Sequence, residues 1–441
     1  MLNRRALLTA GLAFTTAPAF VQAQTQLRGG LDGGAAAGSS QELQRLLEEA
    51  SERSEVVYLP AGTYAVSNLV LPRRTRITGV PGATRLIFSG GGAMVTGEDT
   101  EHVELTGLTF DGANTPLGEA SRALIDLRRP AEVAITRCVI LNSAKSGLAL
   151  ESAAGRVEDC TITGAAEHAI YSVQARGLSI AGNTVADCGD GGILVHRWEP
   201  GEDGTIVSEN RISRIGARSG GTGQVGNGIN LFRAHTVTVS NNKIADCAFS
   251  AIRSNGGSNA VITGNSCLRS GETGLYAEFQ FDGAVIGSNL VDGAANGISV
   301  VNFNEGGRLA TVTGNIVRNL RSTGPYPSDP PGFGTGIAVE ADTVVTGNVV
   351  ENAPLFGIHL GWGEFMRNVV ASNNVIREAG IGISVTVVEG TGSAVVTDNV
   401  ISGARNGSII GHRWTERATG DLATGEEQPF ANLRVSGNQV L

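Results

Sequence analysis

The chain has 441 residues, of which 62 are glycine, and aromatic residues make up only 5% of it. Its apolar residues are mostly Val, Ile, Leu and Ala, interleaved with Asn and Thr, which is typical of turn-rich β-structure and not of helices. The formal net charge of −9 argues against a nucleic-acid partner held through phosphate contacts. Beyond the N-terminal segment, no apolar run is long enough to span a bilayer.

The first 23 residues have the features of an export signal. Arg4 and Arg5 precede an apolar run, and a V-Q-A sequence ending at Ala23 provides a small-residue cleavage site. Adjacent arginines before hydrophobic residues are typical of the twin-arginine class, which carries folded cargo, although Asn3 stands where Ser or Thr is usual. An ordinary secretory signal is the alternative. Both predict a periplasmic or secreted mature protein, residues 24–441.

Internal repetition dominates the rest of the chain. A pattern V-x-x-N-x-V, followed after several residues by G-I-x-V, recurs mostly every 23–27 residues, with longer gaps where loops are inserted. Short runs with period-2 alternation at a near-constant spacing predict strands that stack on their own copies, about 4.8 Å apart. The sequence therefore predicts an all-β solenoid of about a dozen coils, each with three short strands, as a single domain over 24–441.

One asparagine per coil occupies the same place in this pattern. It usually follows Gly, Ser or Asp at a tight corner, where a left-handed backbone is tolerated. Stacked amides at such a corner are expected to hydrogen-bond along the column. The members of this asparagine column are Asn183, Asn210, Asn242, Asn265, Asn289, Asn315, Asn348, Asn374, Asn399 and Asn438.

Five cysteines are an odd number for an exported protein. Cys138 and Cys160 replace the asparagine on adjacent earlier coils, where a disulfide between them is an alternative. Cys188 and Cys247 share another column at roughly 10 Å, beyond the reach of a disulfide. We therefore expect buried thiols and not a disulfide framework.

The N-terminal part of the mature chain predicts a cap, which a solenoid needs over its first coil. Residues 39–53 predict a capping helix, with Ser40 as N-cap and an apolar face that includes Leu43 and Leu47. The sequence VYLPAGTY and an I-T-G turn follow. This arrangement closely resembles the N-terminal cap and first coil of the pectate-lyase-like β-helix superfamily. With the twin-arginine start, the repeats also resemble a functionally uncharacterised family of twin-arginine-translocated β-helix repeat proteins.

The superfamily resemblance implies a right-handed single-stranded parallel β-helix with its polysaccharide groove along the G-I-x-V strands. Residues between the inward Ile and Val of these strands point outward, which defines two columns. The first column is Ala149, Tyr171, Leu194, Asn230, Arg253, Tyr276, Ser299, Ala338, His359 and Ser384. The second column is Glu151, Val173, His196, Phe232, Asn255, Glu278, Val301, Glu340, Gly361 and Thr386.

The middle of these columns suggests chemistry. Arg253 is expected beside Tyr276, and Asn255 beside Glu278, on adjacent coils. An Arg beside a Tyr, with His196 nearby, could abstract the proton α to a uronate carboxyl and return a proton to the leaving oxygen. We therefore predict Arg253, Tyr276 and His196 as catalytic residues of a lyase on an acidic, uronate-containing polysaccharide. A non-catalytic binding face or a plain solvated face is the alternative, so enzyme activity stays open.

Further residues are predicted to hold the sugar. All three tryptophans follow such strands, two of them in an echoed H-R-W sequence, and aromatic rings suit the apolar faces of sugars, with loop packing as the alternative. The inserted loops 199–204, 216–227, 322–335 and 415–429 are expected to wall a cleft. The predicted substrate-binding residues are Asn230, Asn255, Glu278, Gln280, Arg197, Trp198, His359, Trp362 and Trp414.

No metal site or cofactor is assigned. Glu199, Glu202 and Asp203 carry oxygen ligands of the kind that Ca²⁺ uses, but a solvated acidic loop is the preferred interpretation. A glycoside hydrolase needs two carboxyls at a defined separation, and Glu278 and Glu340 lie two coils apart, about 10 Å or more. Signatures of polygalacturonases and alginate epimerases are missing too, so a hydrolase or an epimerase is less favoured than a lyase.

Two non-enzymatic functions are the rivals. One is a polysaccharide-binding or cell-envelope structural solenoid. The other is an assembly protein, because the last coil would present an open strand edge that either the 415–429 loop or a second chain could cover. The sequence leaves both a monomer and a homo-oligomer open.

Overall fold

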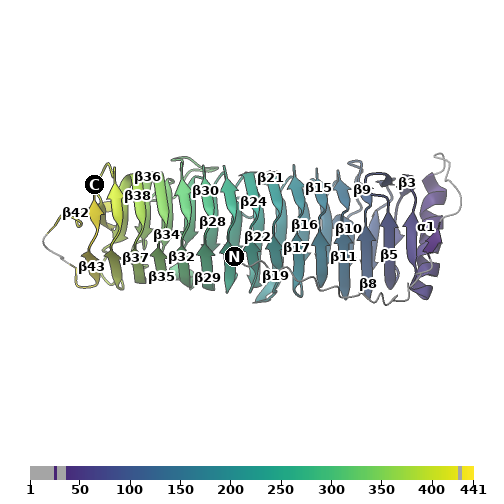
Figure 1. Cartoon of the computed structure of the whole chain (residues 1–441), viewed down its shortest axis with the longest axis horizontal. Helices are drawn as coiled ribbons and strands as arrows, with labels where there is room; N and C mark the ends of the chain where they lie inside the picture. The colour runs from purple at the N-terminus through teal and green to yellow at the C-terminus, as the bar shows by residue number, and fades with distance from the viewer. Residues whose placement is uncertain (1–23, 27–35, 426–429) are drawn as a thin grey trace, which may run out of the picture.

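The computed structural model describes residues 24–26, 36–425 and 430–441, with side chains from Ser40 onward. The predicted signal over 1–23 lies outside these residues. The chain forms a long rod in which strands stack along the long axis and α1 (Ala36–Arg53) closes one end (Figure 1). The rod has about 14 turns, so the prediction of an all-β parallel solenoid with an N-terminal helix is confirmed.

Two parallel sheets run the length of the rod, one of 16 strands and one of 28; we call them sheet A and sheet B. Sheet A takes one strand per coil. Its strands are β1 (Gln24–Gln26), β2 (Val56–Leu59), β5 (Arg74–Gly79), β8 (His102–Thr106), β11 (Glu132–Thr136), β14 (Gly155–Glu158), β17 (Leu178–Ala181), β20 (Ile206–Ser208), β23 (Thr238–Ser240), β26 (Ala260–Thr263), β29 (Asp282–Gly287), β32 (Arg308–Thr313), β35 (Ala341–Thr346), β37 (Arg367–Ser372), β39 (Ala394–Thr397) and β43 (Leu433–Ser436).

Sheet B takes two strand positions per coil. The first position, directly after the asparagine corner in the regular coils, holds β3 (Gly62–Val66), β6 (Thr84–Phe88), β9 (Thr109–Asp111), β12 (Val139–Leu141), β15 (Thr161–Thr163), β18 (Thr184–Ala186), β21 (Arg211–Ile215), β24 (Lys243–Cys247), β27 (Ser266–Leu268), β30 (Leu290–Asp292), β33 (Ile316–Arg318), β40 (Val400–Ser402) and β44 (Gln439–Val440). Two long strands, β36 (Val349–Leu360) and β38 (Val375–Thr386), fill both positions of their coils.

The second position of sheet B holds the G-I-x-V strands that build the candidate site. They are β4 (Leu69–Val70), β7 (Val95–Glu98), β10 (Ala123–Arg128), β13 (Ser146–Glu151), β16 (His168–Val173), β19 (Gly191–Glu202), β22 (Asn227–His235), β25 (Ile252–Asn255), β28 (Thr273–Glu278), β31 (Asn296–Val300), β34 (Thr335–Val339) and β41 (Ile409–Arg413). A short 3₁₀ turn, η1 (Phe303–Glu305), follows β31.

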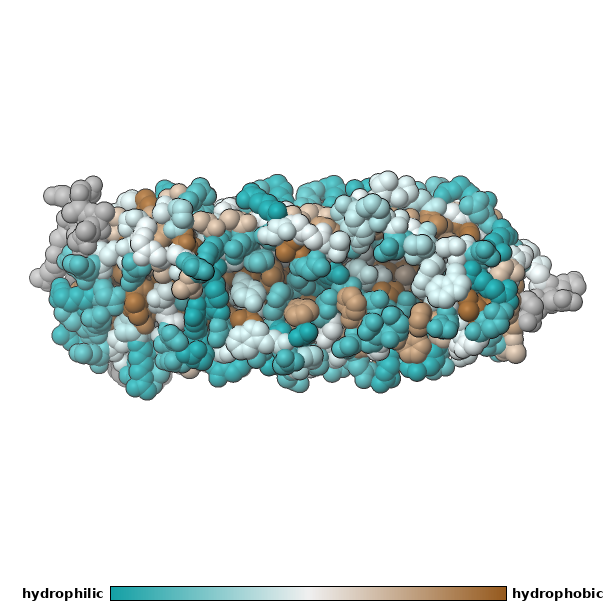
Figure 2. Space-filling view, turned by 180° about the vertical axis from the view of Figure 1, so that it is seen from behind, coloured by the Kyte–Doolittle hydropathy of each residue, from teal (hydrophilic) through white to brown (hydrophobic). Residues whose placement is uncertain are grey.

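One apolar core fills the interior of the rod. In each G-I-x-V strand the Ile position points inward and stacks on its counterpart, as Ile252, Leu275 and Ile298 do in adjacent coils. These side chains are at most 1% exposed and belong to a single cluster that extends from the helix to the last coil. Seen from behind, apolar patches lie among hydrophilic side chains along the outside (Figure 2).

The asparagine column forms a continuous hydrogen-bonded ladder, as predicted. Asn242 is representative: its Nδ2 donates to Asn265 Oδ1 at 3.0 Å and to Val207 O at 3.0 Å. Its backbone N–H donates to the same Asn265 Oδ1 at 3.0 Å. The left-handed backbone sits one residue earlier, as at Gly264 with φ 68°. Each amide thereby satisfies corner groups that no strand reaches.

All five cysteines are buried and free, which confirms the expectation of buried thiols. The alternative of a disulfide between Cys138 and Cys160 is wrong. Instead the two thiols donate to the backbone carbonyls of Leu105 and Ile135, each at 3.4 Å, so they pack as small core residues.

The capping helix is present but begins earlier than predicted. Because α1 starts at Ala36, Ser40 lies inside the helix and is not its N-cap. The Ser40 hydroxyl instead accepts a hydrogen bond from the backbone N–H of Ser67 at 2.9 Å, which fastens the helix to the first coil. Leu43 and Leu47 are buried against that coil, at 3% and 1% exposure.

Two of the four predicted loops contain strand over several residues, while the other two include only the first residue of a strand, Asn227 and Thr335. Residues 199–202 continue β19, whose far end pairs Gly201 with Ala234 of β22 after a shift of register. The predicted loop 199–204 is therefore wrong over most of its length. Within 415–429, β42 (Glu416–Asp421) folds back antiparallel onto β41 and covers its open edge, the role that the sequence suggested. No helix in the described parts of the chain has the length and apolarity needed to cross a membrane.

Candidate functional site

The outward columns predicted on the G-I-x-V strands exist with the predicted register. Arg253 pairs with Tyr276 and Asn255 with Glu278 between β25 and β28. The face is far less solvated than an exposed polar surface would be, because Glu278 is only 2% exposed. Loops that pack on sheet B, together with close stacking, therefore create an enclosed polar environment.

Of the three predicted catalytic residues, Arg253 and Tyr276 are in contact, whereas His196 lies apart from them. The Arg253 guanidinium lies 5.3 Å from the centre of the Tyr276 ring, as expected for neighbours. His196 lies three coils before Tyr276, about 14 Å away, and its ring packs 5.6 Å from both Tyr171 and Phe232. Burial in this aromatic cluster lowers the pKa of His196 to about 3. His196 thus lies in an aromatic cluster apart from the contact between Arg253 and Tyr276, and its catalytic role stays a prediction.

Arg253 forms its hydrogen bond within the protein. Its Nε donates to Glu278 Oε1 at 2.5 Å, and Asn255 Nδ2 donates to the same oxygen at 3.0 Å. The 216–227 loop lies directly over the guanidinium, since a Cβ at Gly223 would overlap Arg253 Nη1. Burial also raises the pKa of Tyr276 well above its ordinary value. In this structure the Arg253 guanidinium therefore lies under the loop and is bonded to Glu278, while its Nη1 has no hydrogen-bond partner.

A groove of about 220 Å³ lies further along the same face, over β28, β31, β34 and β36. The inserted segment that includes 326–335 forms one of its walls, as predicted for that loop. The groove is lined by Tyr276, Asn296, Ile298, Ser299, Val301, Tyr326, Ser328, Asp329, Pro330, Pro331, Gly332, Phe333, Thr335, Ala338, Glu340, His359 and Trp362. Three predicted site residues, Tyr276, His359 and Trp362, thus meet here.

Glu340 is the chemically distinctive residue of the groove. It directly follows β34, and its Oε2 accepts the backbone N–H of Phe303 at 2.6 Å. Burial raises the pKa of Glu340 to about 7, although the Phe303 N–H partly offsets this rise. A carboxyl with such a pKa can give up or take a proton near neutral pH.

Aromatic rings line the C-terminal end of the groove. The His359 ring stacks on Phe356, with 4.9 Å between ring centres and 17° between planes, and Trp362 lies 6.3 Å from His359. Trp362 in turn meets the half-exposed Trp414 edge-on at 5.5 Å. Both His359 nitrogens are buried without a hydrogen-bond partner, and burial lowers the pKa of His359 to about 3. The imidazole is therefore neutral, and both of its nitrogens are closed off from solvent in this structure.

The remaining predicted binding residues do not reach the groove. Asn230 Nδ2 holds the 216–227 loop by donating to Gln224 O at 3.2 Å. Arg197 lies 3.9 Å from the buried Asp203. The exposed Trp198 is six coils from Trp362, about 29 Å. Neither these residues nor the exposed Gln280 line this groove. Tyr326, Asp329 and Phe333 were missed by the sequence prediction.

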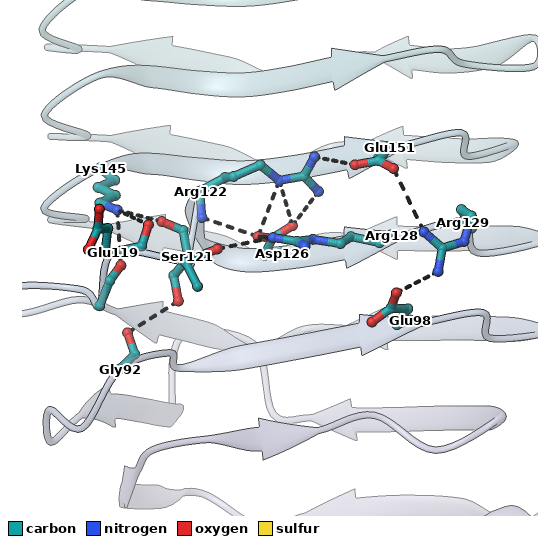
Figure 3. Close-up of polar contacts among 12 residues, drawn as sticks. Gly92, Glu98, Glu119, Ser121, Arg122, Asp126, Arg128, Arg129, Lys145 and Glu151 are labelled. Atoms are coloured by element: carbon teal, nitrogen blue, oxygen red, sulfur yellow. Dashed lines mark hydrogen bonds and ion pairs between the residues drawn. The ribbon is translucent and has the colours of Figure 1, made fainter.

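A second polar cluster occupies the N-terminal coils of the same sheet (Figure 3). Arg122 donates to Asp126 Oδ1 at 2.5 Å and to Glu151 Oε2 at 2.5 Å. Lys145 Nζ donates to three backbone carbonyls, of Gly118, Glu119 and Ser121, at 2.7–3.2 Å. A cavity of about 280 Å³ adjoins the cluster. Because these cations are bonded within the protein, the cluster braces adjacent coils.

The acidic residues considered for Ca²⁺ make internal contacts. Asp203 is 3% exposed and accepts the Thr205 hydroxyl, while Glu202 accepts the Thr236 hydroxyl at 3.1 Å. Among the described residues, no three His, Cys, Asp or Glu side chains are grouped to hold a metal ion.

The fold and the groove define the class: a right-handed parallel β-helix with a lateral groove on one sheet. A family model described as "Right handed beta helix region" matches residues 85–226 and 201–366, and the chain belongs to this family. The superfamily resemblance inferred from the sequence is thereby confirmed. A search of curated protein sequences found no significant match.

Solved structures are similar in fold. The N-terminal fragment of bacteriophage phi29 gene product 12 has a TM-score of 0.51 at 16% identity, covering 90% of this chain and 68% of that one. The pre-mature form of gene product 12 gives 0.50 at 15% identity, covering 84% and 53%. A mannuronic acid specific polysaccharide family 6 lyase from human gut microbiota gives 0.47 at 13% identity, covering 86% of each chain. At these identities the likeness concerns the fold alone.

Proposed function

We propose that the chain is a carbohydrate-active protein whose groove over β28, β31, β34 and β36 binds a glycan and cleaves a glycosidic bond. One observation carries the proposal: the buried carboxyl of Glu340 lies in an open groove whose walls include aromatic rings. Planar rings pack on the apolar faces of sugars, while Asn296 and Ser299 offer hydrogen bonds to hydroxyl groups.

Hydrolysis suits the groups in the groove. Protonated Glu340 gives its proton to the glycosidic oxygen as the bond between that oxygen and the anomeric carbon breaks. Asp329, on the loop wall, is the second carboxylate of the groove and takes a proton from the attacking water. The water oxygen forms the new bond to the anomeric carbon. This assignment replaces the predicted Arg253, Tyr276 and His196.

Elimination on a uronate chain is the second candidate, favoured by the contact between Arg253 and Tyr276. It requires the 216–227 loop to move, because the loop covers the guanidinium that would neutralise the uronate carboxyl. The third candidate function is non-catalytic glycan binding by the same groove.

The test is a panel of neutral, amino and uronate polysaccharides, followed by reducing ends and by absorbance of the unsaturated uronate in parallel. Reducing ends without absorbance, lost in Glu340→Gln and in Asp329→Asn but kept in Gln280→Ala, support hydrolysis. Absorbance that disappears in Arg253→Ala supports elimination. Binding without new reducing ends and without absorbance supports the non-catalytic function. If the protein shows no binding and no turnover, the groove is rejected as a glycan site.

We also infer that the protein acts outside the cytoplasm, on the basis of its twin-arginine-like start. Replacing Arg4 and Arg5 with Lys should retain the precursor in the cytoplasm, as cell fractionation would show; unchanged export would favour an ordinary secretory signal.

A further inference from the structure

The groove carries the carboxyl groups of Asp329 and Glu340, and its lining contains no Lys or Arg. The nearest guanidinium on the same column, that of Arg253, is paired with Glu278. A third carboxyl lies behind the wall, where Tyr326 Oη donates to Glu272 Oε1 at 2.5 Å. A ligand that carries carboxylates would be repelled here, whereas a cation would be attracted.

The same walls are aromatic. Tyr276, Tyr326, Phe333 and Trp362 all line the groove, and the Tyr326 and Phe333 rings meet at 61° with 5.6 Å between their centres. Rings at an angle to each other, with carboxylates beside them, form the environment that stabilises an ammonium group through cation–π and ionic contacts.

We propose that the groove is selective for glycans with free, positively charged amino groups, bound with the ammonium beside Asp329 and Glu340 and the sugar rings against the aromatic walls. This inference rests on the proposed glycan function and names its substrate class. It also explains the absence of a free cation from the lining, which a uronate chain would require.

The test compares two ligands of the same sugar backbone whose amino groups are either free and charged or acetylated and neutral. Binding of a glucosamine hexamer and of the fully N-acetylated hexamer is measured by calorimetry on the full chain, at low and high NaCl. The amino form should bind at least about tenfold more tightly, which corresponds to about 1.4 kcal/mol. That preference should shrink in high salt and in Asp329→Asn, and Gln280→Ala should keep it.

Each outcome bears on a different conclusion. Equal affinity for the two hexamers would overturn the amino-sugar inference and leave the glycan function standing. A preference that survives both Asp329→Asn and Glu340→Gln would also overturn it, because the ammonium would then bind elsewhere. Failure of both hexamers, and of neutral and uronate chains, would reject the glycan function itself.

Discussion

At the scale of single residues, Glu340 shows how position sets reactivity. It stands at the end of β34, so its side chain leaves the regular pattern of the sheet and enters the groove. Burial disfavours its charged form and raises its pKa to about 7. Glu278 is also buried, but its Oε1 accepts hydrogen bonds from Arg253 and Asn255. It is therefore less able than Glu340 to exchange a proton with a ligand.

Glu340→Gln should reduce cleavage by roughly 10²–10⁴-fold while the protein stays folded. Because the acid must carry its proton, the Glu340-dependent limb of the rate should be highest below pH 7 and fall as the pH rises through about 7. A pH–rate profile with a preferred substrate measures this. An alkaline limb that is unchanged in Glu340→Asp would assign the proton to another group.

At the scale of elements, the asparagine ladder stabilises the corner between sheet A and sheet B. Each side chain bonds two backbone groups that the strands cannot reach. Asn289, for example, donates to Ile262 O and accepts from the backbone N–H of Asn265. Removing one amide therefore leaves several buried groups without partners.

Asn289→Ala should lower the free energy of unfolding by about 3 kcal/mol or more, since each orphaned buried group costs about 1–3 kcal/mol. Asn438→Ala is the matched control, because the partly exposed Asn438 can exchange its bonds for water. Urea unfolding of both variants measures the difference. Equal destabilisation would show that water reaches the ladder along its whole length.

The 216–227 loop is the element that covers the Arg253 guanidinium. Gly223→Ala should displace it, because the new Cβ would overlap Arg253 Nη1, and the loop amides should then exchange hydrogen faster. Gly220→Ala is the control: Gly220 also has a positive φ, of 77°, but nothing lies within 4 Å of an added Cβ. If both variants exchange alike, backbone strain and not the contact with Arg253 governs the loop.

At the scale of the whole molecule, much of the fold could be predicted because each coil repeats the same sequence pattern. Register, columns and ladder all follow from period-2 alternation and one corner residue. The groove could not be predicted from this repeated pattern. Tyr326, Asp329 and Phe333 come from an insertion that has no counterpart in other coils. The solvent exposure of an outward residue such as His196 also depends on the side chains and loops that pack around it.

The rod also depends on its ends. Leu47 of α1 is 1% exposed against the first coil, so Leu47→Asp should detach the cap and expose a row of unpaired strand groups. We expect concentration-dependent association, detected by light scattering during size-exclusion chromatography. The exposed Glu52→Asp is the control, and a monodisperse Leu47→Asp protein would mean that α1 is dispensable as a cover.

The ladder gives the rod a direction. In every step the amide of one coil donates forward to the oxygen of the next, from Asn183 to Asn210 and onward to Asn438, so the side-chain carbonyl dipoles point the same way. Dipoles aligned head to tail polarise one another. The column is therefore a row of like-oriented amides whose two ends differ electrically, beside sheets whose strands run parallel except for the antiparallel β42.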